Sequence, residues 1–212
     1  MRSILPIVVL FLGCGDKDES PEDTDTPADA DTDADADTDA DTDADSDTDT
    51  DTDSDTDVVF AVSSPDFADS AGHPQAAQCD WVLPDMFSCN GPNPEIAWTG
   101  APAGTVAYAL IFDDPDAGDY EHWAIYNVPV SEMGLARGMS EGVMPGNAVE
   151  LPNQAGGGGY FGSCPPTTHI YRWRLWALDA EISLQQPTFS ALENAANAAM
   201  LGSANICTIY TP

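Results

Sequence analysis

Short apolar runs recur through the second part of this 212-residue chain, and they predict β-strands. Such runs occupy residues 58–62, 105–112 and 122–128. The run 105–112 is apolar on both faces, which is typical of a strand inside a sandwich. Residues 171–178 alternate between two faces of a further strand. One face carries Tyr171, Trp173, Leu175 and Ala177, and the other carries Arg172, Arg174, Trp176 and Leu178.

One helix is expected near the end of the chain. Ser190 followed by Glu193 matches a capping box, and the Ala-rich run 191–201 predicts a helix that ends at Gly202. A last extended piece is expected at 206–210. Because strands come first and one helix comes late, the pattern favours a mainly β fold. We expect an antiparallel β-sandwich with a few short helices and a C-terminal helix.

The segment before residue 58 has a different composition. Residues 29–57 carry Asp at every second position, so they offer no apolar face and repel one another, and disorder is expected. The 43 residues 15–57 could reach roughly 140–150 Å when extended. Calcium loops also alternate Asp, but they need a turn Gly and a closing bidentate acid. No Gly lies between Asp16 and Asp57, so we interpret the segment as a solvated spacer with at most weak, diffuse cation binding.

The first residues resemble a targeting signal. Met1-Arg2-Ser3 gives a positive start, and residues 4–13 form an apolar run that is too short to span a bilayer. The sequence Phe11-Leu12-Gly13-Cys14 resembles a bacterial lipobox, in which the Cys is lipidated. The alternative is a plain signal peptide with an incidental Cys. We expect a signal peptide at 1–13, lipidated Cys14 and spacer at 14–57, and one folded domain at 58–212. The protein would face the periplasm or the exterior of a bacterial cell envelope, held by its lipid anchor alone.

The folded segment 58–212 is strongly acidic. It holds 16 acidic residues against Arg137, Arg172 and Arg174, a net charge of −13. Nucleic-acid binding is excluded because it requires Lys and Arg to neutralise phosphates. Electrostatic docking on anionic lipid is excluded for the same reason.

Four cysteines remain in the exported domain once Cys14 is assigned to lipid. They are Cys79, Cys89, Cys164 and Cys207, and an even number in an oxidising compartment indicates two disulfides. The spacing alone allows three pairings. No Cys-x-x-Cys pair occurs, which argues against a zinc ribbon or a thioredoxin-type site.

Three local features carry candidate chemistry. Asp113-Asp114-Pro115-Asp116 follows an apolar strand, His122-Trp123 opens the next one, and a Gly/Pro loop from Gly162 ends in His169. Each has an ordinary explanation when taken alone, as an acidic turn, a structural His or a loop with an incidental His. Their order along the chain is more specific than any one of them.

Together these features resemble the two signature regions of the phosphatidylethanolamine-binding protein family, including its bacterial Raf-kinase-inhibitor-like branch. The first region reads DPDAG followed by HWAIYNVP, and the second reads GSCPPTTHIYRWRLWALD. Residues 89–98 resemble an upstream family stretch with two residues missing. The resemblance covers residues 58–212.

The resemblance implies a β-sandwich with a small pocket for an anionic, phosphate-like group. Imidazole N–H groups, loop N–H groups near 162–164 and the Tyr171 hydroxyl would donate to the anion. A carboxylate would fix the tautomer of a His and raise its pKa, so binding should tighten at mildly acid pH. The implied site consists of Asp114, Asp116, His122, Cys164, Pro165, Pro166, His169 and Tyr171.

The chain departs from the family pattern at several points. Gly118 replaces a usual Pro, Ile170 replaces a usual Arg, and two loops are short. An aromatic residue that often flanks the pocket is missing unless Tyr120 takes its place. The resemblance also favours a Cys89–Cys164 disulfide, which leaves Cys79 with Cys207. A Cys79–Cys89 pair is the close alternative.

We therefore predict a non-catalytic envelope lipoprotein that binds a small anion or a phosphorylated head group, without cofactor or metal. The alternative is a protein-interaction module, such as a peptidase or kinase inhibitor-like regulator, with an unknown protein partner. A hydrolase built on Ser163 is a weaker idea because Ser163 does not lie on a strand-to-helix elbow. His73 lies in an irregular stretch and matches no family position.

Overall fold

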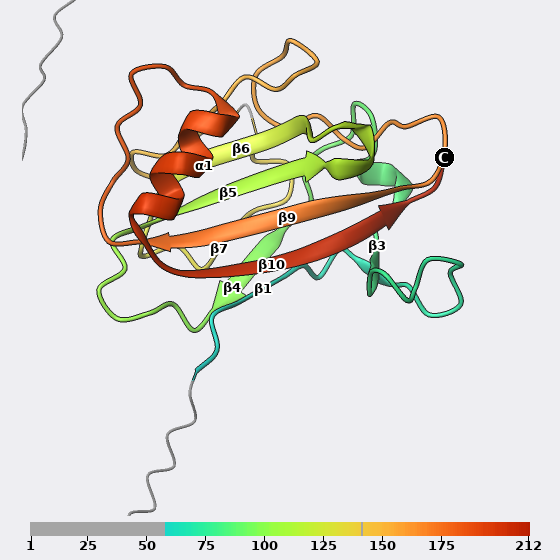
Figure 1. Cartoon of the computed structure of the whole chain (residues 1–212), viewed down its shortest axis with the longest axis horizontal. Coiled ribbons are helices and arrows are strands. Elements are labelled where there is room, and N and C mark those ends of the chain that lie inside the picture. The colour runs from blue at the N-terminus through green and yellow to red at the C-terminus, as the bar shows by residue number, and fades with distance from the viewer. Residues whose placement is uncertain (1–57, 141) are drawn as a thin grey trace, which may run out of the picture. The chain divides into compact units, whose positions relative to one another are not determined.

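A computed structural model describes residues 58–140 and 142–212. The expected signal peptide, the lipidation site at Cys14 and the Asp-rich spacer lie outside the described residues. Two sheets and one helix form three layers, and Figure 1 shows α1 lying against one face of the larger sheet. Among the described residues, no helix is long and apolar enough to cross a membrane.

The larger sheet has seven strands in the order β2-β3-β10-β9-β5-β6-β8, and the smaller has three in the order β1-β4-β7. All neighbours are antiparallel except β3 and β10. The strands are β1 (Ala61–Ser63), β2 (Ala68–Asp69), β3 (Trp81–Val82), β4 (Ile96–Thr99), β5 (Ala107–Asp114), β6 (Tyr120–Pro129), β7 (Gly134–Leu135), β8 (Val149–Glu150), β9 (His169–Leu178) and β10 (Met200–Tyr210). The helices are η1 (Asp85–Phe87), η2 (Pro115–Ala117) and α1 (Phe189–Ala198).

Strand β9 contributes to two separate cores, as its alternating sequence predicts. Trp173 and Leu175 point into the core between the two sheets, where Trp173 stacks on Phe112 with 3.9 Å between ring centroids. Trp176 and Leu178 point to the opposite face. There they pack with residues of α1, so the second half of β9 buries apolar side chains on both faces. The expected mainly β sandwich with a C-terminal helix is confirmed.

The helix begins and ends earlier than its sequence indicates. Thr188 is the N-cap, and its hydroxyl accepts a hydrogen bond from Ala191 N–H at 3.2 Å, so the capping box predicted at Ser190 is wrong. Glu193 instead pairs with Arg174. Gly202 does not end the helix, because Met200 already pairs with Leu178 of β9. The pairing of β10 with β9 therefore overrides the Ala-rich pattern.

The predicted strands are shifted or too short. The run 58–62 pairs only from Ala61, and 206–210 is the second half of an eleven-residue strand that begins at Met200. Strand β5 continues to Asp114 and β9 begins at His169, so pairing extends into polar residues. Both extensions matter because they carry the candidate site residues on regular strands.

A β-bulge in β6 is held by one asparagine. Tyr108 faces Val128 and Leu110 faces Ile125, so the register shifts at Asn127, whose φ is 57°. The Asn127 side chain accepts from Ile182 N–H at 2.7 Å and donates to Ile182 O at 2.9 Å. It thereby satisfies two buried backbone groups and ties the loop before α1 to β6.

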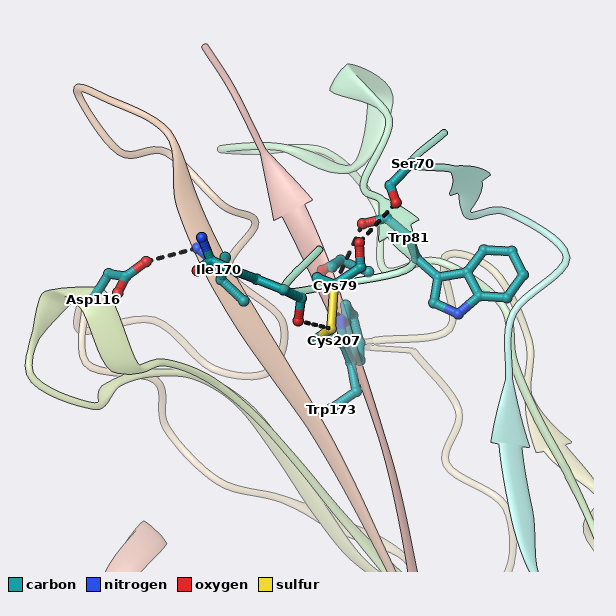
Figure 2. Close-up of a disulfide and its surroundings, with 9 residues drawn as sticks. Ser70, Cys79, Trp81, Asp116, Ile170, Trp173 and Cys207 are labelled. Atoms are coloured by element: carbon teal, nitrogen blue, oxygen red, sulfur yellow. Dashed lines mark hydrogen bonds between the residues drawn. A yellow bond between two sulfur atoms is a disulfide. The ribbon is translucent and has the colours of Figure 1, made fainter. Parts of the chain in front are cut away.

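Two disulfides join distant parts of the domain. They pair Cys89 with Cys164 and Cys79 with Cys207, the pairs that the family resemblance favours. The second one fixes the segment before β3 to β10 (Figure 2). Ser70 donates to Cys79 O at 2.7 Å beside it. A cross-link over 128 residues restricts the unfolded chain, which stabilises the fold.

Removing the Asn127 side chain should destabilise the domain. We expect Asn127→Ala to cost about 2–4 kcal/mol, because two buried groups of Ile182 lose their partners and Ala is strained at positive φ. Asn127→Gly is the matched control, since it loses the same hydrogen bonds but tolerates the backbone angle. It should be about 1 kcal/mol more stable than the Ala variant in urea denaturation. Equal stability of all three proteins would contradict the role given to Asn127.

Candidate functional site

A pocket of about 360 Å³ opens at one end of the larger sheet. It lies where β5 ends, where β6 and β9 begin, and where η2 connects β5 to β6. Its lining is mostly apolar, with a few polar groups among aromatic and proline side chains. The lining residues are Asp114, Ala117, Tyr120, His122, Phe161, Cys164, Pro165, Pro166, His169 and Tyr171.

Asp114 organises one wall of the pocket. This buried carboxylate is the N-cap of η2 and accepts hydrogen bonds from Asp116 N–H at 3.0 Å and Ala117 N–H at 3.1 Å. Its other oxygen accepts from His169 Nδ1 at 2.7 Å. Pro115 presets the backbone for this short turn. The turn and the imidazole are therefore held by one side chain, as expected for a carboxylate that orients a His.

His122 enters the pocket from a second β-bulge. Phe112 faces Trp123 and Asp113 faces Glu121, so the pairing of β5 with β6 skips His122. The skipped residue turns its ring toward Phe112 and Tyr171, with centroids 5.1 and 5.3 Å away. A bulge of this kind re-aims a side chain at a sheet edge. His122 is only 4% exposed.

The hydrogen bonds of the two histidines fix which nitrogen carries the proton. His122 Nδ1 lies 2.8 Å from Phe161 O, and a carbonyl can only accept, so Nδ1 carries the hydrogen. His169 Nδ1 likewise donates to Asp114. Each neutral imidazole therefore already donates its only N–H to a group of the protein. The prediction that neutral imidazoles donate to an anion is therefore wrong, and Nε2 can donate only after the ring takes up a second proton.

Burial works against that second proton on His122. Loss of hydration lowers the pKa of His122 below its usual 6.5, although the Phe161 backbone and the charges of Asp114 and Asp113 act in the opposite direction. Burial also raises the pKa of Tyr171 far above its usual value, and nearby Asp114 adds to the increase. Tyr171 therefore keeps its phenolic proton and remains a donor.

Two buried hydroxyl groups lie at or beside the pocket without a well-aligned partner. Tyr171 Oη and Ser163 Oγ make no hydrogen bond of good geometry with the described residues. They are close enough for Ser163 and Asp114 to influence the pKa of Tyr171. Buried polar groups are normally paired, so these two are available to a ligand or to water. Ser163 itself is fully buried and is not among the lining residues.

The structure brings together seven of the eight residues implied by the family resemblance. Asp116 is the exception, because it is exposed and does not line the pocket. Its carboxylate accepts from Ile170 N–H at 2.9 Å and so fastens η2 to the start of β9 (Figure 2). Asp116 thus positions the pocket wall from outside the lining.

The loop 161–166 forms the opposite rim of the pocket. Gly162 is required there because a Cβ would lie 2.4 Å from Phe87 O. Its N–H donates to Cys89 O at 2.9 Å, and Ser163 O accepts from Cys89 N–H at 3.0 Å. The N–H of Gly162 is therefore not free for an anion, contrary to expectation. The Cys89–Cys164 disulfide fastens the same loop covalently.

Asp113, the neighbour of Asp114, points to the other face of the sheet. It is buried and forms ion pairs at 2.7 Å with both Arg172 and Arg174. Arg172 also pairs with Asp119, and Arg174 with Glu193 of α1. Two of the domain's three arginines are thereby committed outside the pocket. The titratable nitrogen groups that line the pocket are those of His122 and His169.

The sequence reasoning missed two parts of the pocket. Ala117 follows Asp116 in η2, and Phe161 precedes the second family motif, where adjacency to that motif is the only signal. Tyr120 lines the pocket and packs against His122 with centroids 5.0 Å apart, so an aromatic residue does flank the site. Within residues 58–140 and 142–212, no cluster of His, Cys, Asp and Glu could hold a metal ion.

The protein is a two-sheet β domain with a small histidine-containing pocket at one end of the larger sheet. Comparison of its sequence with protein families identifies the family to which it belongs. The model of the phosphatidylethanolamine-binding protein family matches residues 63–211. The chain belongs to this family.

Several relatives extend the comparison. A UPF0098 protein of Methanothermobacter thermautotrophicus is 38% identical over 109 residues, which cover 49% of this chain and 72% of that protein. The Mycobacterium tuberculosis protein named "Putative lipoprotein LppC" is 37% identical over 130 residues, or 58% of this chain and 57% of LppC. Among solved structures, Escherichia coli YbcL has a TM-score of 0.62 at 24% identity and covers 72% of this chain and 98% of its own. Chlamydia trachomatis CT736 has a TM-score of 0.59.

Burial of His122 predicts a loss of stability in mild acid. Above pH 6.5 the ring is neutral in both states, so its depressed pKa has no effect there. As the pH falls below 6.5, the unfolded chain takes up a proton that the folded protein resists. Stability should then fall by up to about 1.4 kcal/mol per pH unit until the lower folded pKa is reached.

Urea denaturation between pH 7.5 and 5 measures this slope. His122→Gln removes the titrating group and should flatten the slope over that range. An equal slope in the parent and the variant would show that another group is responsible.

Proposed function

We propose that this protein binds a small anion in the pocket between His122 and His169, without catalysing a reaction. The observation that carries the proposal is the unpaired Tyr171 hydroxyl beside two imidazole rings in a mostly apolar cavity. In the described part of the chain, Tyr171 Oη is buried without a hydrogen-bond partner, and the side-chain hydrogen bonds of His122 to Phe161 O and of His169 to Asp114 use Nδ1. Groups that are buried and unpaired are costly unless a ligand or water completes them.

The charge of the anion has to be balanced inside an acidic domain. Asp114 is negative and buried in the pocket wall, and Arg172 and Arg174 are occupied on the other face. Two imidazolium rings would supply two N–H donors and two positive charges, and the Tyr171 hydroxyl would supply a third donor. An anion therefore binds together with protons taken from water. A phosphate-like group fits because it offers several acceptor oxygens.

The proton linkage makes the proposal testable. Titration calorimetry with inorganic phosphate and with phosphoethanolamine should show at least about tenfold tighter binding at pH 5.5 than at pH 7.5. Repeating the titration in buffers of different ionisation enthalpy should reveal net proton uptake. His122→Gln and His169→Gln should each lose this pH dependence and most of the affinity.

His73→Gln is the matched control because His73 lies outside the pocket lining, bonded to Thr211 Oγ1 at 3.2 Å. It should bind as the parent does. Absence of heat at millimolar ligand at both pH values would refute anion binding. Binding that does not change with pH would refute the role of the histidines.

We also propose that Cys14 is lipidated and holds the domain on a membrane of a bacterial cell envelope. Support comes from the lipobox-like sequence ending at Cys14 and from similarity to the protein named as a lipoprotein in Mycobacterium tuberculosis. Two disulfides in the domain fit an oxidising compartment outside the cytoplasm.

Loss of the lipid acceptor should release the protein. We expect Cys14→Ser to move the protein from the membrane fraction to the soluble envelope fraction, because no acyl chain can then be attached. Intact mass spectrometry of the parent should show a diacylated or triacylated N-terminal Cys. An unmodified Cys14 in the mature protein would contradict the proposed anchor.

A further inference from the structure

Three uncharged segments form part of the end of the domain opposite to the pocket, while Asp179 and Glu132 lie just beyond the ends of β9 and β6 there. Ala107, Leu178 and Met200 lie in register across β5, β9 and β10 at this end. The other ends of the same strands carry Asp114 and His169, which belong to the pocket. Figure 1 shows the first described residues entering beside the start of β10, away from the C-terminus. Residues 58–64, 100–107 and 199–204 contain no charged side chain, although the domain carries a net charge of −13.

These three segments form one continuous surface. Val58 packs against Gly100, and Leu201 lies next to Gly104. Gly202 is packed between Pro102 and Phe60, and a Cβ there would lie 2.8 Å from the Pro102 ring. Val106 N–H donates to Leu178 O at 2.8 Å, which joins the second segment to β9.

Five large apolar side chains are exposed on this surface, and we call them the apolar pole. Their exposed fractions are 71% for Val58, 73% for Val59, 46% for Val106, 44% for Met200 and 41% for Leu201. Scattered apolar residues are normal on protein surfaces, but a contiguous and uncharged group indicates a contact surface.

The place where the N-terminal segment joins the domain indicates what covers the pole. Val58 belongs to the pole and is preceded by 57 residues that include Cys14. The tether therefore joins the domain at this end and not at the pocket. A second copy is disfavoured because two domains of net charge −13 repel each other. Anionic lipid is disfavoured for the same reason, and Asp179 borders the pole through a hydrogen bond from its N–H to Ala199 O.

We propose that the apolar pole rests on the uncharged, zwitterionic lipid surface of the membrane that holds Cys14. This inference rests on the proposed lipid anchor. Short apolar side chains enter the boundary between head groups and acyl chains, where they lose contact with water. The pocket then faces away from the membrane, because it lies at the other end of the same strands. Its anion is taken from the aqueous side and not from a head group of the anchoring bilayer.

Neutron reflectometry on a supported phosphatidylcholine bilayer that carries the lipidated full chain tests the contact. The protein layer should lie directly against the bilayer. Met200→Glu with Leu201→Glu should move it outward, to a distance limited by the tether at roughly 140 Å. Met86→Glu is the matched control, because Met86 is 53% exposed and lies next to Phe87, which packs against the pocket loop. It should leave the layer in place.

Three outcomes would overturn the contact. They are a detached layer in the parent, an unchanged layer in the double variant, or tighter contact when anionic phosphatidylglycerol is added. A dimer of Cys14→Ser that Met200→Glu dissociates in sedimentation would show instead that a second copy covers the pole. If Cys14 is not lipidated in the cell, coupling its thiol to a maleimide lipid still reports on the pole. An unlipidated Cys14 in the cell would therefore refute the anchor, whereas a detached protein layer on the bilayer would refute the contact.

Discussion

The pairing of β5 with β9 decides what each end and each face of this protein can do. Side chains alternate along a strand, so neighbours in sequence point to opposite faces. Asp113 reaches Arg172 and Arg174 on the helix-covered face, while Asp114 reaches His169 in the pocket. A slip of one residue would exchange the two carboxylates and bury an unpaired charge on each side. Both faces therefore fix the same register.

The pocket is set up by hydrogen bonds that leave it without free positive charge. Asp114 and the Phe161 carbonyl each take an N–H from an imidazole, and both arginines nearby are paired elsewhere. Burial then favours the neutral form of His122. Any anion that enters the pocket must therefore be matched by protonation as well as by shape.

Polar and apolar groups are also separated along the length of the strands. Polar and titratable groups collect where β5 ends and β9 begins, and uncharged apolar groups collect where β5 begins and β9 ends. The two disulfides do not hold the apolar pole. Cys89–Cys164 fastens the pocket loop, and Cys79–Cys207 fastens β10 near the register position of Arg172. Covalent reinforcement thus lies toward the half of the domain that carries the pocket.

Local signals in the sequence predict the long strands approximately, the two-faced pattern of residues 171–178 and the family, because apolar periodicity and the DPDA, His-Trp and Cys-Pro-Pro motifs are local; the short strands β2, β3, β4, β7 and β8 were not predicted. The sequence placed Asp114, His122, His169 and Tyr171 in one pocket through the family resemblance. The folded structure was needed to show that Asp116 fastens a turn, that a bulge aims His122, and that each imidazole already donates its N–H within the protein. These outcomes depend on which groups of distant segments meet, and no local pattern encodes that. The end of α1 also could not be predicted from local sequence, because strand pairing of Met200 with Leu178 ends the helix within an Ala-rich run that favours helix.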